Sequence, residues 1–74
     1  MPTEKDKERF KAIEYVVKTK EGYREDLIDA IGQDYVNEFE TLGYISSGYT
    51  WERKTWGCLN LARKEYDILK EYFI

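Results

Sequence analysis

One glycine interrupts the most regular apolar pattern of this chain and thereby sets strong limits on its fold. Apolar residues recur at helical spacing on both sides of Gly32: Leu27, Ile28 and Ile31 before it, and Val36, Phe39 and Leu42 after it. Apolar side chains at such intervals line one face of a helix, and a glycine readily ends one. We therefore predict helices over residues 23–31 and 33–42, joined by a tight corner at Gly32 and each buried along its apolar side.

The segments around this corner predict three further elements. An apolar stripe of helical period marks residues 3–19 as an amphipathic helix, with these residues on its buried side: Phe10, Ile13, Val16 and Val17. Gly22 is expected to close that helix, and Gly43 the helix over 33–42. Residues 44–61 are rich in Tyr, Trp and Thr around a polar turn, which predicts a β-hairpin. A renewed helical pattern predicts a last helix over residues 62–73.

Alternation of side chains along the hairpin predicts which of them face the helices. If Ile45 and Leu61 both point inward, Tyr49 shares their face, while Tyr44 and Trp56 point outward. Outward aromatic side chains of this kind would be available to a protein partner or to a second copy of the chain.

Charge and residue usage exclude several classes of function. The 74 residues suffice for one domain with a small core, and their net charge is −3 rather than strongly positive. Any affinity for DNA must then come from local basic patches. The chain has no His and only one Cys, Cys58, so no metal site, cofactor or activated nucleophile is predicted. We expect a non-enzymatic protein.

The sequence also bears on compartment. No apolar run approaches the roughly 20 residues of a membrane span, and no secretory signal pattern is present. Because Cys58 is alone, it cannot form an intrachain disulfide, which fits a reducing compartment. We expect a cytoplasmic protein that makes no contact with a membrane.

The order helix, helix, helix, strand, wing, strand, helix resembles the winged helix-turn-helix family. Residues 39–45, FETLGYI, are similar to the L-x-x-L-G-x-I join between recognition helix and first wing strand in many prokaryotic winged-helix regulators. Residues 59–69, LNLARKEYDIL, are similar to the exit from the wing, and the resemblance covers residues 10–73. Chain length and composition also resemble the small winged-helix proteins of archaeal viruses and plasmids. The resemblance implies an α+β, mainly α fold: a winged helix-turn-helix in a single domain over residues 1–74, with three helices, a β-hairpin wing and a C-terminal helix.

The resemblance further implies that the helix over 33–42 lies in the major groove of double-stranded DNA. Four of its side chains are candidates for base, phosphate or thymine-methyl contacts: Gln33, Tyr35, Asn37 and Thr41. Glu38 and Glu40 would meet phosphates unfavourably, because like charges repel at close range. A solvated helix face without a ligand is the competing interpretation.

The wing over residues 51–56 is a second candidate for contact with DNA. Its adjacent cations Arg53 and Lys54 can bind backbone phosphates. Further phosphate contacts are predicted for Arg24, Arg63 and Lys64. A turn that is merely solvated, with Trp51 and Trp56 packed across the hairpin, is the competing interpretation.

Two functions from different classes remain open. The first is a transcriptional regulator that binds double-stranded DNA, as a dimer formed through its terminal helices. The second is a non-enzymatic protein–protein interaction module, in which the acidic face of residues 33–42 and the aromatic hairpin contact a protein partner. Cations gathered around the wing and this helix would favour the first, and an acidic surface there would favour the second.

Overall fold

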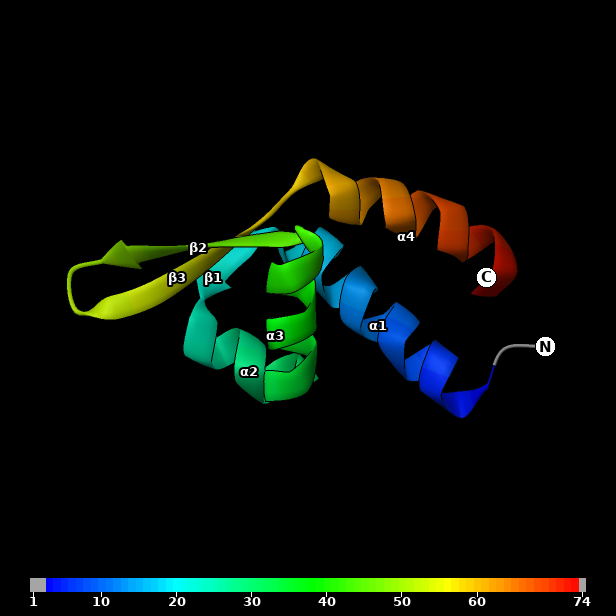
Figure 1. Ribbon diagram of the computed structural model, residues 1–74, viewed down its shortest axis with the longest axis horizontal. Coiled ribbons are helices and arrows are strands. Elements are labelled where there is room, and N and C mark those ends of the chain that lie inside the picture. The colour runs from blue at the N-terminus through cyan, green and yellow to red at the C-terminus, as the bar shows by residue number, and fades with distance from the viewer. Residues whose placement is uncertain (1–2, 74) are drawn as a thin grey trace.

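Three strands form an antiparallel sheet in the order β1-β3-β2 within the residues that the structure describes, 3–73 (Figure 1). The computed structural model adds four helices in the same residues, so the fold is α+β and mainly helical. In chain order the elements are α1 (Glu4–Thr19), β1 (Glu21–Tyr23), α2 (Arg24–Ile31), α3 (Gln33–Leu42), β2 (Ile45–Thr50), β3 (Arg53–Cys58) and α4 (Asn60–Phe73). None of these described helices is both long and apolar enough to cross a lipid bilayer.

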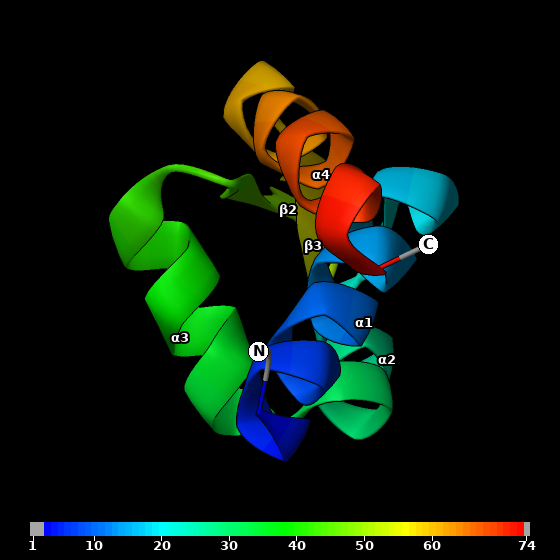
Figure 2. The same cartoon turned by 90° about the vertical axis from the view of Figure 1, so that its right-hand side faces the viewer.

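A reciprocal cap starts α1, and aromatic packing joins this helix to α4. The Thr3 hydroxyl accepts a hydrogen bond from the Asp6 N–H at 3.1 Å, and the Asp6 carboxylate accepts one from the Thr3 N–H at 3.2 Å. This arrangement satisfies donors that the first turn of a helix leaves free. Phe10 is buried as predicted, and its ring stacks on Phe73 of α4 with the ring centres 4.7 Å apart. Figure 2 shows α4 lying beside α1, with α3 at the left of the view.

Gly32 alone separates α2 from α3. Its N–H donates to the Ile28 carbonyl at 2.8 Å and closes α2, while its own carbonyl accepts from the Val36 N–H at 3.2 Å and opens α3. Its φ of 95° and ψ of 152° lie where glycine is nearly the only residue found. Gly43 closes α3 with φ 80°, in the left-handed region. The predicted ends of both helices are confirmed.

The core lies where these helices meet the sheet. Leu27, Val36 and Phe39 are fully buried, as their spacing predicts. Leu42 is different: 42% of its surface is exposed, so its predicted burial is wrong. Leu42 is the last residue of α3, and the chain turns at Gly43 into β2. The Leu42 side chain therefore lies at the edge of the core rather than inside it.

The short strand β1 was not predicted. Lys20, rather than Gly22, takes the positive φ, 75°, that ends α1. Gly22 instead lies within β1, where it pairs with Trp56 of β3. A Cβ on Gly22 would stand 3.4 Å from the Trp56 indole nitrogen, an ordinary van der Waals contact, so this edge strand lies against the indole. A strand of three residues has too little pattern to be recognised, and its partners lie far along the chain.

The predicted orientation of the hairpin is wrong for its second strand. Trp56 and Tyr44 are buried, with 4% and 8% of their surfaces exposed, although both were predicted to point outward. Trp56 lies opposite Ser47 in the register, on the same face as Ile45. The error for Trp56 arises at Leu61, which was counted as an inward strand residue but belongs to α4, because that helix already begins at Asn60. Tyr44 precedes β2, in the turn after Gly43, so strand alternation does not apply to it.

Candidate nucleic-acid interface

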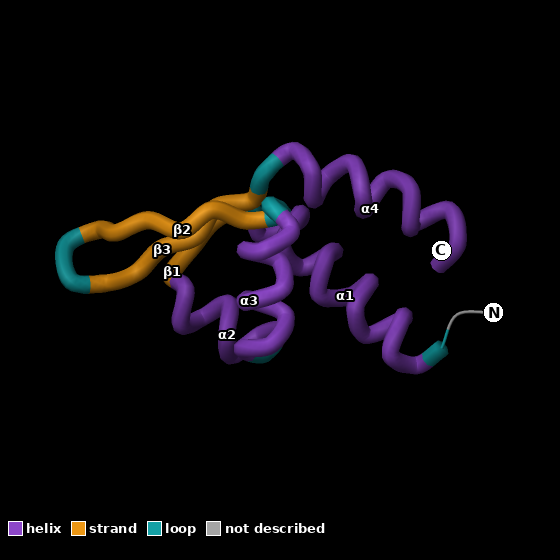
Figure 3. Tube along the Cα trace, viewed as in Figure 1, coloured by secondary structure: helices purple, strands orange, loops and turns teal. Residues whose placement is uncertain are grey.

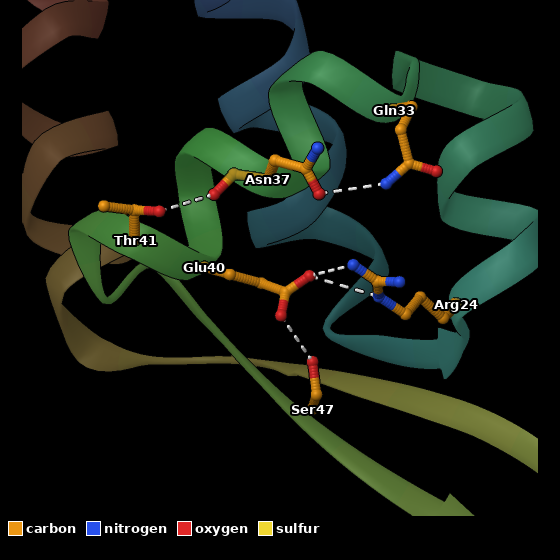
Figure 4. A network of polar contacts seen from close by, with 6 residues as sticks. All are labelled: Arg24, Gln33, Asn37, Glu40, Thr41 and Ser47. Atoms are coloured by element: carbon orange, nitrogen blue, oxygen red, sulfur yellow. Dashed lines mark hydrogen bonds and ion pairs between the residues drawn. The ribbon is translucent and has the colours of Figure 1, made fainter.

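Three neutral polar side chains form a stripe along the solvent face of α3. Gln33, Asn37 and Thr41 stand four residues apart, so they lie one above the other on the helix (Figure 4). Gln33 Nε2 donates to Asn37 Oδ1 at 2.9 Å, and the Thr41 hydroxyl donates to the Asn37 main-chain carbonyl at 3.0 Å. Among residues 3–73, Gln33 Oε1 and the Asn37 amide N–H groups have no hydrogen-bond partner, so they can still accept and donate. We call these three residues the α3 stripe.

Tyr35 does not belong to this stripe, although the sequence grouped it there. Its ring is half-buried and lies 5.8 Å from the Phe39 ring. It lines a hollow against α1 together with Glu8 and Tyr15. Burial, with carboxylates such as Glu8 nearby, raises the pKa of the Tyr35 phenol. Tyr35 therefore contributes to the packing of α1 on α3.

The two glutamates that seemed to oppose DNA binding are both paired with arginines. Glu38 accepts a hydrogen bond from Arg9 Nε of α1 at 2.9 Å. Glu40 accepts from Arg24 Nε at 3.1 Å and from the Ser47 hydroxyl at 3.0 Å, and it forms an ion pair with the Arg24 guanidinium (Figure 4). The charges of Glu38 and Glu40 are therefore compensated, whereas exposed Asp34 in the first turn of α3 forms no ion pair with any of residues 3–73.

The Arg24–Glu40 pair is partly withdrawn from water. Only 18% of the Arg24 side chain and 31% of the Glu40 side chain are exposed. Burial alone would raise the pKa of Glu40, but hydrogen bonds from Arg24 and Ser47, with the charges of Arg24 and Lys54, lower it below its ordinary value. Arg24 thus links α2 to α3 and β2, and its predicted phosphate contact stays a prediction.

Arg53 and Lys54 both line a hollow with Arg24 and Ile28, but they differ in their other neighbours. Arg53 forms an ion pair with Glu25 of α2, and its guanidinium lies 3.8 Å from the centre of the Tyr23 ring. Successive side chains of a strand alternate between faces. Lys54 accordingly turns to the α3 side, where it lines a cleft of about 370 Å³ with Arg24, Glu40, Ser47, Gly48 and Tyr49. Lys54 is therefore the wing cation that shares a surface with α3.

Arg63 and Lys64 are exposed near the start of α4. Arg63 Nη1 donates to the Asn60 side chain at 3.1 Å. This end of α4 adjoins the end of α3, because a Cβ on Gly43 would lie 3.8 Å from Leu61 Cδ2. The structure thus places both cations beyond the C-terminal end of the α3 stripe, and their phosphate contacts stay predictions.

No family model matches this chain. Comparison with curated proteins and with solved structures likewise finds no match. In the part of the chain that the structure describes, no group of His, Cys, Asp and Glu side chains has an arrangement that could hold a metal ion. Function is therefore inferred from the geometry of the described residues.

Sequence reasoning missed two features of this surface. The ion pair of Arg9 with Glu38 was not considered, because the two residues lie 29 positions apart and no local spacing indicates such a pair. The burial of Trp56 was also missed, because this residue was predicted to point outward and lies in the core. The competing interpretation, in which Trp51 packs on Trp56, is wrong, since 97% of the Trp51 surface is exposed. A two-residue turn at Trp51 and Glu52 separates the strands and places Trp51 at the tip.

Proposed function

We propose that this protein is a winged-helix regulator that binds double-stranded DNA and has no enzymatic activity. The order α1-β1-α2-α3-β2-β3-α4 and the sheet order β1-β3-β2 are compatible with that arrangement. In this proposal α2 and α3 form the helix-turn-helix, the β2–β3 hairpin is the wing, and α3 is the helix that enters the major groove.

The observation that carries the proposal is the composition of the outer face of α3. The α3 stripe presents amides and a hydroxyl, and the adjacent Glu38 and Glu40 are compensated by arginines. Thr41 follows Gln33 by eight positions, which is a rise of about 12 Å along the helix at about 1.5 Å per residue. That length spans three to four base pairs at about 3.4 Å each. Asn and Gln are the side chains suited to paired hydrogen bonds with adenine.

Phosphate contacts supply the remaining affinity in this proposal. Lys54 lies on the same side of the sheet as α3 and forms no ion pair with any of residues 3–73. Each phosphate that a cation neutralises releases bound counterions, so binding weakens as salt rises. Because the net charge is −3, we expect affinity to depend strongly on a few such cations.

A titration of fluorescent duplex DNA at low salt tests the proposal. Lys54→Glu should weaken binding at least tenfold and lower the slope of log affinity against log salt by about 1. Lys11→Glu is the matched control, because it makes the same charge change on an exposed position of α1. Absence of binding at micromolar protein, or equal effects of both variants, would refute the proposal. On a selected sequence, Asn37→Ala should cost about 5- to 150-fold and relax the preference for one base.

The outer face of α4 supports a dimer of this regulator. Leu61, Ile68 and Tyr72 form an apolar stripe away from α1, with 50%, 56% and 74% of their surfaces exposed. Lys64 and Glu71 flank the same side of this stripe, one near each end of the helix. Two copies of α4 packed antiparallel would place each Lys64 near the Glu71 of the other copy, so the surface is self-complementary.

Light scattering after size exclusion tests this dimer. Ile68→Glu should give a monomer that is still folded, because the side chain lies outside the core. Lys64→Glu and Glu71→Lys should each weaken the dimer, and the double variant should restore it. A wild-type protein that is monomeric at high micromolar concentration would remove the dimer from the proposal.

A protein-interaction module is the second candidate function. The exposed carboxylates Asp26 and Asp29 on the outer side of α2 favour it, because they suit a basic protein partner better than DNA. In that case the duplex titration gives no binding. Charge reversal at Asp26 and Asp29 would then abolish binding to the protein partner, while Lys54→Glu would leave it unchanged.

A further inference from the structure

We propose that Trp51 at the tip of the β2–β3 hairpin stacks on a base of the bound nucleic acid. The preferred target then carries an unpaired or easily unstacked base beside the duplex site. The hairpin projects beyond the helices (Figure 3), and Trp51 stands at its far end with 97% of its surface exposed. Of the exposed large apolar side chains in the described part of the chain, Trp51 is the most exposed.

The backbone conformation of Trp51 is unusual for a tryptophan. Its φ is 55°, in the left-handed region that favours Gly, Asn and Asp over a bulky side chain. The residue is thus disfavoured both by its backbone and by its exposure to water, and folding alone gives no reason for Trp here. Residues held in such conformations gather at sites that bind ligands.

The neighbours of Trp51 indicate the class of ligand. Tyr49 is 70% exposed, and Lys54 lies directly opposite it in the strand register. Two exposed aromatic rings beside a cation are typical of sites that stack on bases and hold the phosphate backbone. The adjacent Glu52 is exposed, and a carboxylate at the tip opposes insertion into a membrane surface. A nucleic acid therefore fits the tip better than a lipid surface does.

The reach of the hairpin sets the place of the stacked base. This inference rests on the proposed function, with α3 in the major groove. The six residues of β2 extend about 20 Å at about 3.4 Å per residue. With the hairpin lying along the duplex axis, Trp51 would reach a base up to about six base pairs from the end of α3, at about 3.4 Å per base pair. Targets with a single-stranded end or an unpaired base at that distance would gain the stacking contact.

Two DNA molecules test the inference: a blunt selected duplex and the same duplex with one unpaired base about six base pairs from the α3 site. Trp51→Ala should weaken binding to the second DNA about 5- to 150-fold and have a much smaller effect on binding to the blunt duplex. Trp51→Phe keeps an aromatic ring and should retain most of the affinity. Because both variants alter an exposed tip, thermal unfolding should show both folded.

Tryptophan fluorescence gives a second readout. Trp56 is in the core, so acrylamide should quench mainly Trp51, and DNA with the unpaired base should protect Trp51 from the quencher. If Trp51→Ala binds both DNAs as the wild type does and Trp51 stays quenchable, the inference is wrong while the proposed function stands. If neither DNA binds, both fail. Protection by vesicles of phosphatidylserine and phosphatidylcholine, or by a protein partner, in place of DNA would also overturn the inference.

Discussion

The contact between Arg24 and Glu40 gives a prediction in which stability and DNA affinity move in opposite directions. Glu40→Gln keeps the size of the side chain and removes its charge. Hydrogen bonds to charged groups contribute about 1.5–3 kcal/mol. Because Glu40 is 31% exposed and Gln still accepts one hydrogen bond, we expect a loss of about 1–2 kcal/mol in the free energy of unfolding. The melting temperature should fall by about 4–8 °C for each kcal/mol in a domain of this size.

The pH dependence follows from the lowered pKa of Glu40 in the folded protein. The stability that ionised Glu40 contributes is fully present above its ordinary pKa of 4.5 and is lost as pH falls through the lower value of the folded state. The melting curves of wild type and Glu40→Gln, followed by circular dichroism, should differ at pH 7 and converge as pH falls through the lowered pKa of Glu40. Glu4→Gln is the control, because Glu4 is 95% exposed and its Lys7 contact is 3.8 Å long.

The same substitution should raise affinity for DNA if α3 enters the groove. It removes a carboxylate beside the α3 stripe and frees Arg24 for phosphate, which we expect to strengthen binding by about fivefold at low salt. Equal melting temperatures of wild type and Glu40→Gln at pH 7 would refute the stability argument. A drop in affinity of the folded variant would refute the placement of α3.

Three further predictions concern the fold and its single thiol. Gly32→Ala should lower the free energy of unfolding, measured with urea, by about 1–3 kcal/mol, and by more than Gly43→Ala does, because the φ and ψ of Gly32 are nearly exclusive to glycine. This loss is expected even though no atom lies within 4 Å of a Cβ at Gly32. Phe39→Ala should cost about 3–5 kcal/mol in the same assay, because the ring is fully buried; a smaller loss would contradict the described core. Burial raises the pKa of the Cys58 thiol despite the nearby Arg63, so Cys58 should react with iodoacetamide more slowly at pH 7.5 than a free cysteine does and speed up only at higher pH.

The helices could be predicted because their signals are local. The spacing of Leu27, Val36 and Phe39 and the position of Gly32 are readable within a dozen residues, and α3 has the predicted bounds, Gln33–Leu42. Helix geometry turns such spacing into one buried face without any knowledge of partners. The same signal failed at Leu42, because it cannot tell where the core ends.

The sheet was less predictable because its partners are distant in sequence. The three residues of β1 hydrogen-bond to β3, and Glu21 pairs with Gly57. The inner face of β3 was assigned from Leu61, three residues past the observed end of the strand at Cys58, and this odd-numbered error put Trp56 on the wrong side. Because side chains alternate with a period of two, an anchor residue that is wrong by an odd number of positions reverses a whole strand.

The charge of the candidate site could not be predicted. The α3 stripe and Lys54 were named from the sequence as DNA contacts, and those contacts stay predictions. The structure adds that Lys54 and Glu40 of α3 line one cleft. The pairing of Glu38 with Arg9 and of Glu40 with Arg24 joins residues 29 and 16 positions apart. Long-range pairs of this kind leave no trace in local spacing, so the acidity of α3 looked greater than it is.

The shared role of Gly32 limits how this chain can change in length. One residue added at the corner would rotate α3 by about 100° about its own axis, turning Val36 and Phe39 toward water. The turn at Trp51 and Glu52 is under no such constraint, because both side chains are exposed. Insertions and deletions that leave the fold intact should therefore fall at the hairpin tip, where they would change the reach of Trp51, while the corner keeps its single residue.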